Sequence, residues 1–365
     1  MKYDFKTFSL TVLIILSLLA LDRLPGKMSP SALQRRAARV VREMHNGDLN
    51  AEDMHALAAG YYEGLRDDTG VAGVIEQKDI LSRQDFLRYE LRPGLKRPYP
   101  AGMRITNSFG MANPEYGYEK APGTRRIALL GDSLSLGPYG NDYGALLEQR
   151  LNRDFLSPAV QRFELLNFAV YGYSVVQMMD VALDKAPKFH PDVYIVALTS
   201  LEIMGNAGWR THVGRLLRSK VDLKYDFLRS VVAQAGVEPS DQLSVIEKKL
   251  TPFLLPVTRL ALEQIRDHAA SQGSRMIIAL VPIPIDPILS GEDFDRLRQA
   301  VEPVGVPFVD LRDTFESANL QELKVSEEDI HPNARGHRMI YENLYTKLRA
   351  NPDAWTILTG PSPAP

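Results

Sequence analysis

One stretch, residues 125–137 (RRIALLGDSLSLG), constrains the fold of this chain more than any other. Its apolar residues 127–130 lie between basic residues and a glycine, which predicts a buried strand of a parallel sheet followed by a tight turn. That turn places Ser133 at the carboxyl end of the strand. Ligands of open α/β sheets bind beyond the carboxyl ends of the strands, so this hydroxyl is well placed for chemistry, although Gly-Asp-Ser is also an ordinary turn sequence.

A second stretch, residues 328–337 (EDIHPNARGH), contains the groups that such a serine needs. A serine hydroxyl becomes nucleophilic when an imidazole takes its proton, and a carboxylate must orient that imidazole and stabilise its charged form. His331, with Asp329 or Glu328 beside it, supplies both groups. The apolar spacing after Asn333 predicts a final helix over 334–348.

Together, GDSLSLG and DIHPNARGH resemble the nucleophile and histidine blocks of the SGNH, or GDSL, hydrolase family. The resemblance implies that Ser133 is the nucleophile, that its own amide forms part of the oxyanion hole, and that His331 is the base. The common family spacing places the acid at Glu328, whereas the D-x-H spacing of some relatives fits Asp329. We expect Asp329 to be the acid and keep Glu328 as the alternative.

The two remaining blocks of the family match unequally. Residues 165–174 (LLNFAVYGYS) resemble the second block, which implies that the Gly172 amide points at the oxyanion. The third block is normally G-x-N-D, but residues 199–202 read TSLE, so Leu201 stands where an asparagine donor is expected. Loss of one oxyanion donor typically costs about 2.7 to 4 kcal/mol of transition-state stabilisation. The nearby replacement donors are Asn206, Thr199 and Ser200.

The rest of the core predicts a three-layer α/β/α sandwich with a parallel sheet, the flavodoxin-like fold of SGNH hydrolases. Predicted strands at 127–130, 163–168, 193–198, 275–281 and 307–310 alternate with helices at 143–152, 175–185, 256–272 and 293–301. The third and fourth strands are too far apart for a simple crossover, so we predict a helical insertion at 203–255 that caps the active-site mouth. Its basic and aromatic residues form either a binding patch or a solvated helix face; they are Trp209, Arg210, His212, Arg215, Arg218 and Lys220.

The parts outside the core domain at 125–350 are predicted from their composition. An uncharged apolar run at 7–21 would span about 22 Å as a helix, which suits a signal peptide or a short membrane anchor within 1–25. We favour an uncleaved anchor, with the catalytic domain outside the cytoplasm. An accessory helical segment at 26–84 precedes a β/loop segment at 85–124, with short strands near 89–91 and 103–106. The end of the chain, 351–365, is predicted to be flexible.

Composition limits the partners and cofactors. The net charge of −2 gives no reason to expect nucleic acid binding. The absence of cysteine excludes disulfides, a thiol nucleophile and cysteine-ligated metals. A metal bound by His331 and His337 would need further carboxylates, so we expect no metal and no cofactor.

The resemblance implies ester hydrolysis or acyl transfer, and carbohydrate O-acetyl groups are common substrates of exported relatives. The expected partner is therefore an ester, an acylated carbohydrate above all, with the membrane reached through the N-terminal segment. Leu201 sustains an alternative from another class of protein. In that alternative the chain is a catalytically degenerate scaffold that binds glycan or partner proteins in envelope polysaccharide assembly.

Overall fold

The structure is a computed structural model that describes residues 79–99, 101–202, 208–285, 291–327 and 329–360. The predicted anchor at 1–25 and nearly all of the accessory segment at 26–84 lie outside these residues, so both stay predictions. Within the described ranges, no helix is both long enough and apolar enough to cross a membrane.

A five-stranded parallel sheet forms the centre of the described part, with the strand order β6-β5-β7-β8-β9. This confirms the predicted α/β fold and all five predicted strands to within a few residues. The strands are β5 (Thr124–Leu130), β6 (Arg162–Asn167), β7 (Val193–Leu198), β8 (Arg275–Leu280) and β9 (Phe308–Asp310). Because the chain runs outward from β5 in both directions, the carboxyl ends of β5 and β7 lie where the strand order reverses, the usual ligand crevice of such sheets.

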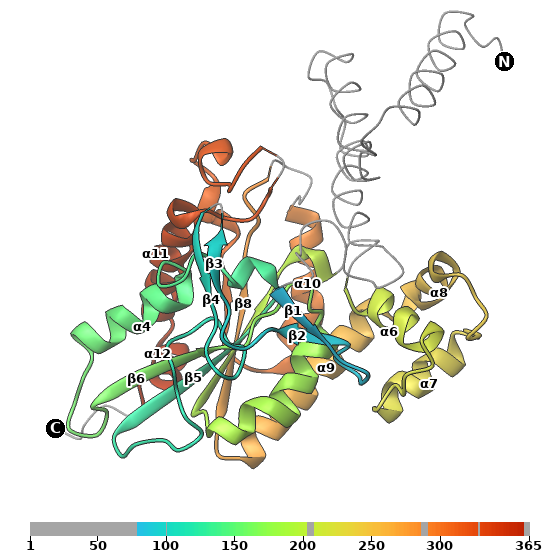
Figure 1. The fold of residues 1–365 in the computed structure, drawn as a ribbon, viewed down its shortest axis with the longest axis horizontal. Helices are drawn as coiled ribbons and strands as arrows, with labels where there is room; N and C mark the ends of the chain where they lie inside the picture. The colour runs from blue at the N-terminus through green and yellow to red at the C-terminus, as the bar shows by residue number, and fades with distance from the viewer. Residues whose placement is uncertain (1–78, 100, 203–207, 286–290, 328, 361–365) are drawn as a thin grey trace, which may run out of the picture. The chain divides into compact units, whose positions relative to one another are not determined.

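The side chains of β5 alternate between two hydrophobic cores, one on each face of the sheet. Ile127 and Leu129 pack into the core beneath α4, α11 and α12, whereas Ala128 and Leu130 pack into the opposite core. Figure 1 shows α4, α11 and α12 on one side of the sheet and α9 and α10 on the other. The helices are α4 (Tyr143–Asp154), α5 (Val175–Asp180), α9 (Leu254–Ser271), α10 (Gly291–Val301), α11 (Ala334–Ala350) and α12 (Pro352–Thr359). The result is the three-layer sandwich that the alternating pattern predicts.

The insertion after β7 is helical, as predicted, and consists of α6 (Trp209–Arg218), α7 (Asp226–Gln234) and α8 (Leu243–Leu250). Its apolar residues join the core on the α5 and α9 face, and Trp209 Nε1 donates a hydrogen bond to the Leu254 carbonyl at 3.3 Å. Trp209, Arg210 and His212 are buried, so the interpretation of these residues as a surface patch is wrong. The amphipathic helix turns this face inward. A position of the insertion over the active-site mouth stays a prediction.

Two hairpins precede the sheet. In the first, β1 (Ile80–Ser82) pairs antiparallel with β2 (Tyr89–Leu91), and in the second, β3 (Lys96–Tyr99) pairs with β4 (Gly102–Ile105). The short strands predicted near 89–91 and 103–106 are confirmed. The helical prediction is wrong at Ile80–Ser82, because a strand of three residues carries no periodicity of its own and forms only through its partner β2.

The end of the chain differs from the prediction of a flexible tail, because residues 352–359 form α12. Asn351 caps this helix by accepting a hydrogen bond from the Ala354 amide at 3.1 Å. Ala354 and Leu358 are buried in the core beneath α11. Arg125, at the start of β5, donates to the carbonyl of Leu358 at 2.8 Å and to that of Ile357 at 2.5 Å. These contacts tie the helix to the sheet; residues 361–365 lie outside the described part.

A buried arginine joins the amino-terminal end of the sheet to the loops around it. Arg126 is 2% exposed and donates from Nε to Glu164 Oε2 at 2.8 Å. Its remaining donors bond the carbonyls of Tyr118, Glu119 and Phe189 at 2.7 to 2.9 Å. A buried charge is tolerated when it is paired and fully hydrogen-bonded, as it is here.

Arg126→Met should lower the free energy of unfolding by about 3 to 5 kcal/mol, because Glu164 and three carbonyls would lose their buried partner. Urea denaturation followed by circular dichroism measures this change. Arg162→Met is the matched control, since Arg162 contacts the other oxygen of Glu164 at 3.3 Å but is largely exposed. We expect the control to cost less than about 1 kcal/mol. Equal losses of unfolding free energy in the two variants would contradict the role of Arg126 as a buried structural partner of Glu164.

Candidate active site

The turn that contains the candidate nucleophile, Ser133, follows β5 directly. Ser133 begins the short 3-10 helix Ser133–Ser135, and Asp132 Oδ1 caps it by accepting a hydrogen bond from the Leu134 amide at 2.8 Å. Gly131 is needed at the bend, since a Cβ there would lie 2.4 Å from Ser135 Oγ. Ser133 is 8% exposed. The turn therefore presents a nearly buried hydroxyl at the carboxyl end of β5, where the sequence predicts it.

A histidine–carboxylate pair lies just before α11. His331 Nδ1 and Asp329 Oδ1 are 2.6 Å apart, and the same oxygen accepts the His331 backbone amide at 3.0 Å. This arrangement orients the imidazole and favours a proton on Nδ1, which leaves Nε2 as the basic nitrogen. His331 is 7% exposed. The alternative acid, Glu328, lies outside the described residues.

The electrostatics of Asp132 show that these two segments lie close together. Burial raises the pKa of Asp132 to about 6, while the Leu134 hydrogen bond and a Coulombic interaction with His331 oppose that rise. His331 therefore lies within Coulombic range of the residue that precedes Ser133. The fold brings together two motifs from opposite ends of the core domain.

Two backbone amides near Ser133 have no acceptor within the described part of the protein, as the donors of an oxyanion hole require. Among the described residues, neither the Ser133 amide nor the Gly172 amide donates a hydrogen bond to another protein group. The Gly172 loop adjoins the nucleophile turn through the Val170 amide, which lies 3.4 Å from the Gly131 carbonyl. Gly172 has φ +61°, a conformation that other residues adopt only at a cost. Both amides are therefore free to stabilise a developing negative charge.

The third block is occupied differently from the family pattern. Thr199 Oγ1 donates to Asp132 Oδ2 at 3.2 Å, so this hydroxyl is already engaged. Ser200 is fully buried, and its hydroxyl has no hydrogen-bond partner within the part of the chain that the structure describes. Leu201 is 6% exposed and belongs to neither of the two hydrophobic cores. Asn206 lies outside the described residues.

Glu202 is a buried acid that the sequence analysis did not single out. It is 3% exposed, and its Oε2 accepts a hydrogen bond from the Val175 amide at 3.1 Å, at the start of α5. Burial raises its pKa to about 8, and the neighbouring charge of Asp132 acts in the same direction. Glu202 thus carries a proton at neutral pH and joins the third block to the segment after Gly172. The sequence signal was a carboxylate four residues after the end of a fully buried strand, β7.

Side chains from other elements contact the residues that follow Ser133 in the turn. Ser135 Oγ and the Tyr143 hydroxyl are 2.6 Å apart, and Asn167 Nδ2 donates to the Ser135 carbonyl at 2.8 Å. The ring of His337 packs against Gly137, where a Cβ would lie 2.4 Å from Nε2. Burial lowers the pKa of His337 to about 3, so it is a neutral packing residue. Among the described residues, no group of three His, Asp or Glu side chains is arranged to hold a metal ion.

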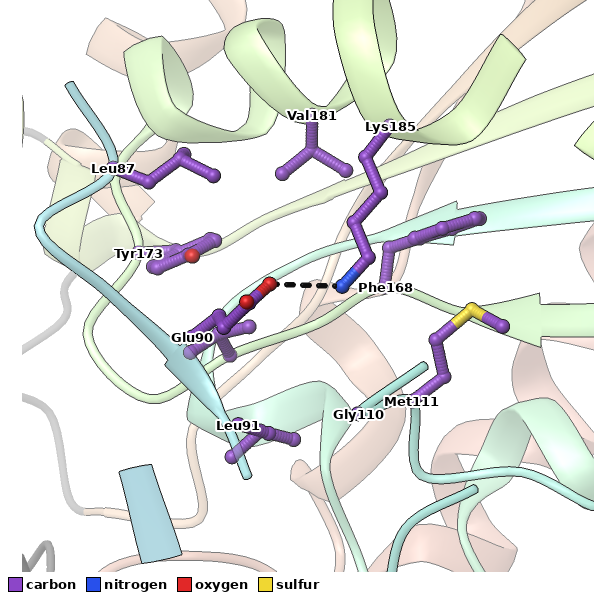
Figure 2. A pocket seen from close by; sticks show the side chains of 10 residues that line it. Leu87, Glu90, Leu91, Gly110, Met111, Phe168, Tyr173, Val181 and Lys185 are labelled. Carbon is purple, nitrogen blue, oxygen red and sulfur yellow. Dashed lines mark hydrogen bonds and ion pairs between the residues drawn. The ribbon is translucent and has the colours of Figure 1, made fainter. Parts of the chain in front are cut away.

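A small cavity is lined by residues of β2, of the segment 168–173 and of the helical segment Val181–Lys185, together with Leu87, Gly110 and Met111 (Figure 2). Lys185 reaches into it and pairs with Glu90 at 3.0 Å, and the other lining side chains that Figure 2 labels are mainly apolar. Its volume of about 10 Å³ is the space of about one water molecule. This cavity is too small for an acyl chain.

The raised pKa of Glu202 predicts how stability changes with pH. Between pH 4.5 and 8 the unfolded chain loses this proton while the folded protein keeps it, so stability falls as the pH rises, by up to about 1.4 kcal/mol per pH unit. In Glu202→Gln this contribution should vanish, and the variant should gain stability relative to the wild type toward pH 8. Urea denaturation between pH 5 and 8.5 tests this, with the exposed Glu238→Gln as control. Parallel curves for the wild type and Glu202→Gln would refute it.

The comparison with known families gives the class of protein. The sequence profile of the GDSL-like lipase/acylhydrolase family matches residues 129–339, more than half of the chain. The chain therefore belongs to this family, and the resemblance inferred from GDSLSLG and DIHPNARGH is confirmed. The matched range contains both the nucleophile turn and the His331–Asp329 pair. No curated protein matches the chain in sequence.

Several solved structures are similar to this chain at low sequence identity. An acetylxylan esterase from Geobacillus stearothermophilus is 14% identical, with a TM-score of 0.41, and the match covers 61% of this chain and 94% of that one. An α/β hydrolase from the metagenome of Lake Arreo is 16% identical, with a TM-score of 0.41, over 63% and 96% of the two chains. The esterase EstA from a Pseudoalteromonas species is 12% identical, with a TM-score of 0.37, over 62% and 97%. Likenesses this distant do not identify a substrate.

Proposed function

We propose that this chain is a serine esterase in which Ser133 is the nucleophile, His331 the general base and Asp329 the residue that orients His331. The observation that carries the proposal is the 2.6 Å contact between His331 and Asp329, together with the Coulombic interaction between His331 and Asp132, the residue before Ser133. The amides of Ser133 and Gly172 supply the oxyanion hole.

In the proposed mechanism, His331 Nε2 takes the hydroxyl proton as Ser133 Oγ attacks the ester carbonyl carbon. The carbonyl electron pair moves to the oxygen, whose negative charge the two amides stabilise. When this intermediate collapses, the bond to the alkoxy oxygen breaks and His331 returns the proton to the departing alcohol. Water, activated in the same way, then releases the acid from the acyl-enzyme; a sugar hydroxyl in place of water would give acyl transfer.

The substrate that we propose is an acetyl ester of a carbohydrate. Ser133 and His331 are only 8% and 7% exposed, which favours a small acyl group over a long chain. We further propose that residues 1–25 anchor the protein, with the esterase domain outside the cytoplasm. Membrane fractionation of cells that make the full-length chain, with protease accessibility of the domain, tests this second part.

Ser133→Ala should lower kcat for p-nitrophenyl acetate and for acetylated xylan by at least about 10³-fold. No other described hydroxyl occupies the position of Ser133 at the carboxyl end of β5, so none can replace it as the nucleophile. Initial rates on the full-length protein measure this, with the exposed Ser271→Ala as control. Retained turnover in Ser133→Ala would overturn the assignment of the nucleophile.

Leu201→Asn tests whether the third block limits the rate. An amide at this position restores the donor that the family pattern contains, and we expect kcat to rise by about tenfold or more. Thermal stability should fall, because a polar amide replaces a buried apolar side chain. Leu201→Met, which keeps the volume without adding a donor, should behave like the wild type. A folded Leu201→Asn with unchanged kcat would show that another group already fills this role.

Leu201, which replaces the expected asparagine donor, also supports a second candidate function. In this alternative the protein is a non-catalytic scaffold that binds glycan or partner proteins. A wild-type protein that binds acetylated xylan without cleaving acetate, and that Leu201→Asn does not activate, would favour the scaffold over the esterase.

A further inference from the structure

Arg104 is a buried cation that comes from outside the family-matched region. It lies on β4 of the second hairpin, before residue 129 where the match begins, and is 2% exposed. Among the described residues it forms no ion pair with a carboxylate, and its Nε has no hydrogen-bond partner. The carboxyl of Asp142 lies within Coulombic range of Arg104 but does not contact it directly. A buried charge without a directly paired carboxylate is costly, so the retention of Arg104 needs an explanation.

The contacts of Arg104 lead to the nucleophile turn. Its Nη1 donates to the carbonyls of Leu136 and Gly137, the latter at 2.8 Å. These carbonyls follow the 3-10 helix that Ser133 begins, where helical bonding no longer supplies donors. Hydrogen bonds from a charged donor are about twice as strong as neutral ones. Arg104 therefore holds the carboxyl end of the turn on which the nucleophile lies.

The same guanidinium also contacts the second block. Its Cζ lies 4.4 Å from the ring centre of Tyr99 and 5.5 Å from that of Tyr171, the residue before Gly172. The planar guanidinium can stack flat on an aromatic face in addition to attracting it through its charge, whereas a lysine ammonium offers the charge alone. A single side chain thus lies between the turn of Ser133 and the loop of Gly172, whose two amides must be placed relative to each other.

The hairpin itself is docked on the same segment. The Tyr139 amide donates to the Met103 carbonyl at 3.0 Å, and Gly102 packs against Pro138. Arg104 therefore lies on a hairpin that is attached to the segment just after the turn of Ser133.

We propose that Arg104 is a positioning residue of the catalytic centre, which fixes the Ser133 turn against the Gly172 loop from a hairpin outside the family domain. The inference deepens the proposed esterase function and rests on it for its catalytic part. Its structural part, the ordering of the turn by Arg104, does not depend on activity.

Arg104→Lys in the full-length protein tests both parts, because lysine keeps the charge but loses the planar fork. We expect kcat for p-nitrophenyl acetate to fall about 10- to 100-fold with KM within about twofold, since misplacement of the reacting groups affects the transition state above all. Amide hydrogen exchange of peptides covering 134–139 should become about tenfold faster, while exchange in β8 stays unchanged.

The matched control is Arg97→Lys, because Arg97 lies directly across the hairpin from Arg104 and pairs with Asp79. This control should change neither kcat nor exchange at 134–139. If Arg104→Lys does not fold, Tyr171→Leu is the second variant, because it removes one aromatic face from the Arg104 guanidinium. It should lower kcat and speed exchange at 134–139 in the same direction, by smaller factors. Wild-type kcat in folded Arg104→Lys, or unchanged exchange at 134–139, would overturn the proposal. If the wild type has no esterase activity, the proposed function fails while the exchange experiment still decides the role of Arg104.

Discussion

The backbone turn after β5 is the constraint on which the rest of the site depends. It must bend sharply to place Ser133 at the end of a buried strand, and Gly131 allows this because no Cβ fits there. Side chains from distant parts of the chain then fix the turn. Asn167 and Tyr143 hold Ser135, Thr199 holds Asp132, and Arg104 holds the carbonyls that follow.

Two buried carboxyl groups lie at the carboxyl end of the sheet, next to the candidate site. Asp132 and Glu202 lie near each other at the carboxyl ends of neighbouring strands, and burial raises the pKa of both carboxyls. At neutral pH we expect one of the pair, Glu202, to be protonated, which avoids two negative charges beside the site of the proposed oxyanion. A neutral acid next to Leu201 is also a chemical difference from the family pattern of asparagine and aspartate.

The sequence predicted the fold well because the signals were local and strong. Each core strand is an uninterrupted apolar run, and the alternation of strands with helices leaves few topologies. The predictions failed where tertiary contacts decide. Arg125 and the Asn351 cap order α12, and burial of Trp209 and His212 removes them from the surface.

Some residues of the candidate site could be predicted from the sequence, and others became visible only in the structure. Ser133, His331, Asp329 and Gly172 carry motif spacing, so the sequence could propose them, and the structure places them in neighbouring segments. Arg104 and Glu202 have no motif, because their roles arise from burial and from carbonyl or amide partners that only the folded backbone brings near. Such residues become visible when the buried polar groups are matched with their partners.

The most direct test of the central claim is the site of a covalent fluorophosphonate adduct, mapped by peptide mass spectrometry on the folded full-length protein. The phosphonyl group forms a bond to an activated serine oxygen with loss of fluoride, so it reports the nucleophile without knowledge of the ester. The account predicts a single adduct on Ser133 that is lost in His331→Ala. A folded protein that stays unlabelled, or that carries the adduct on another residue, would contradict it.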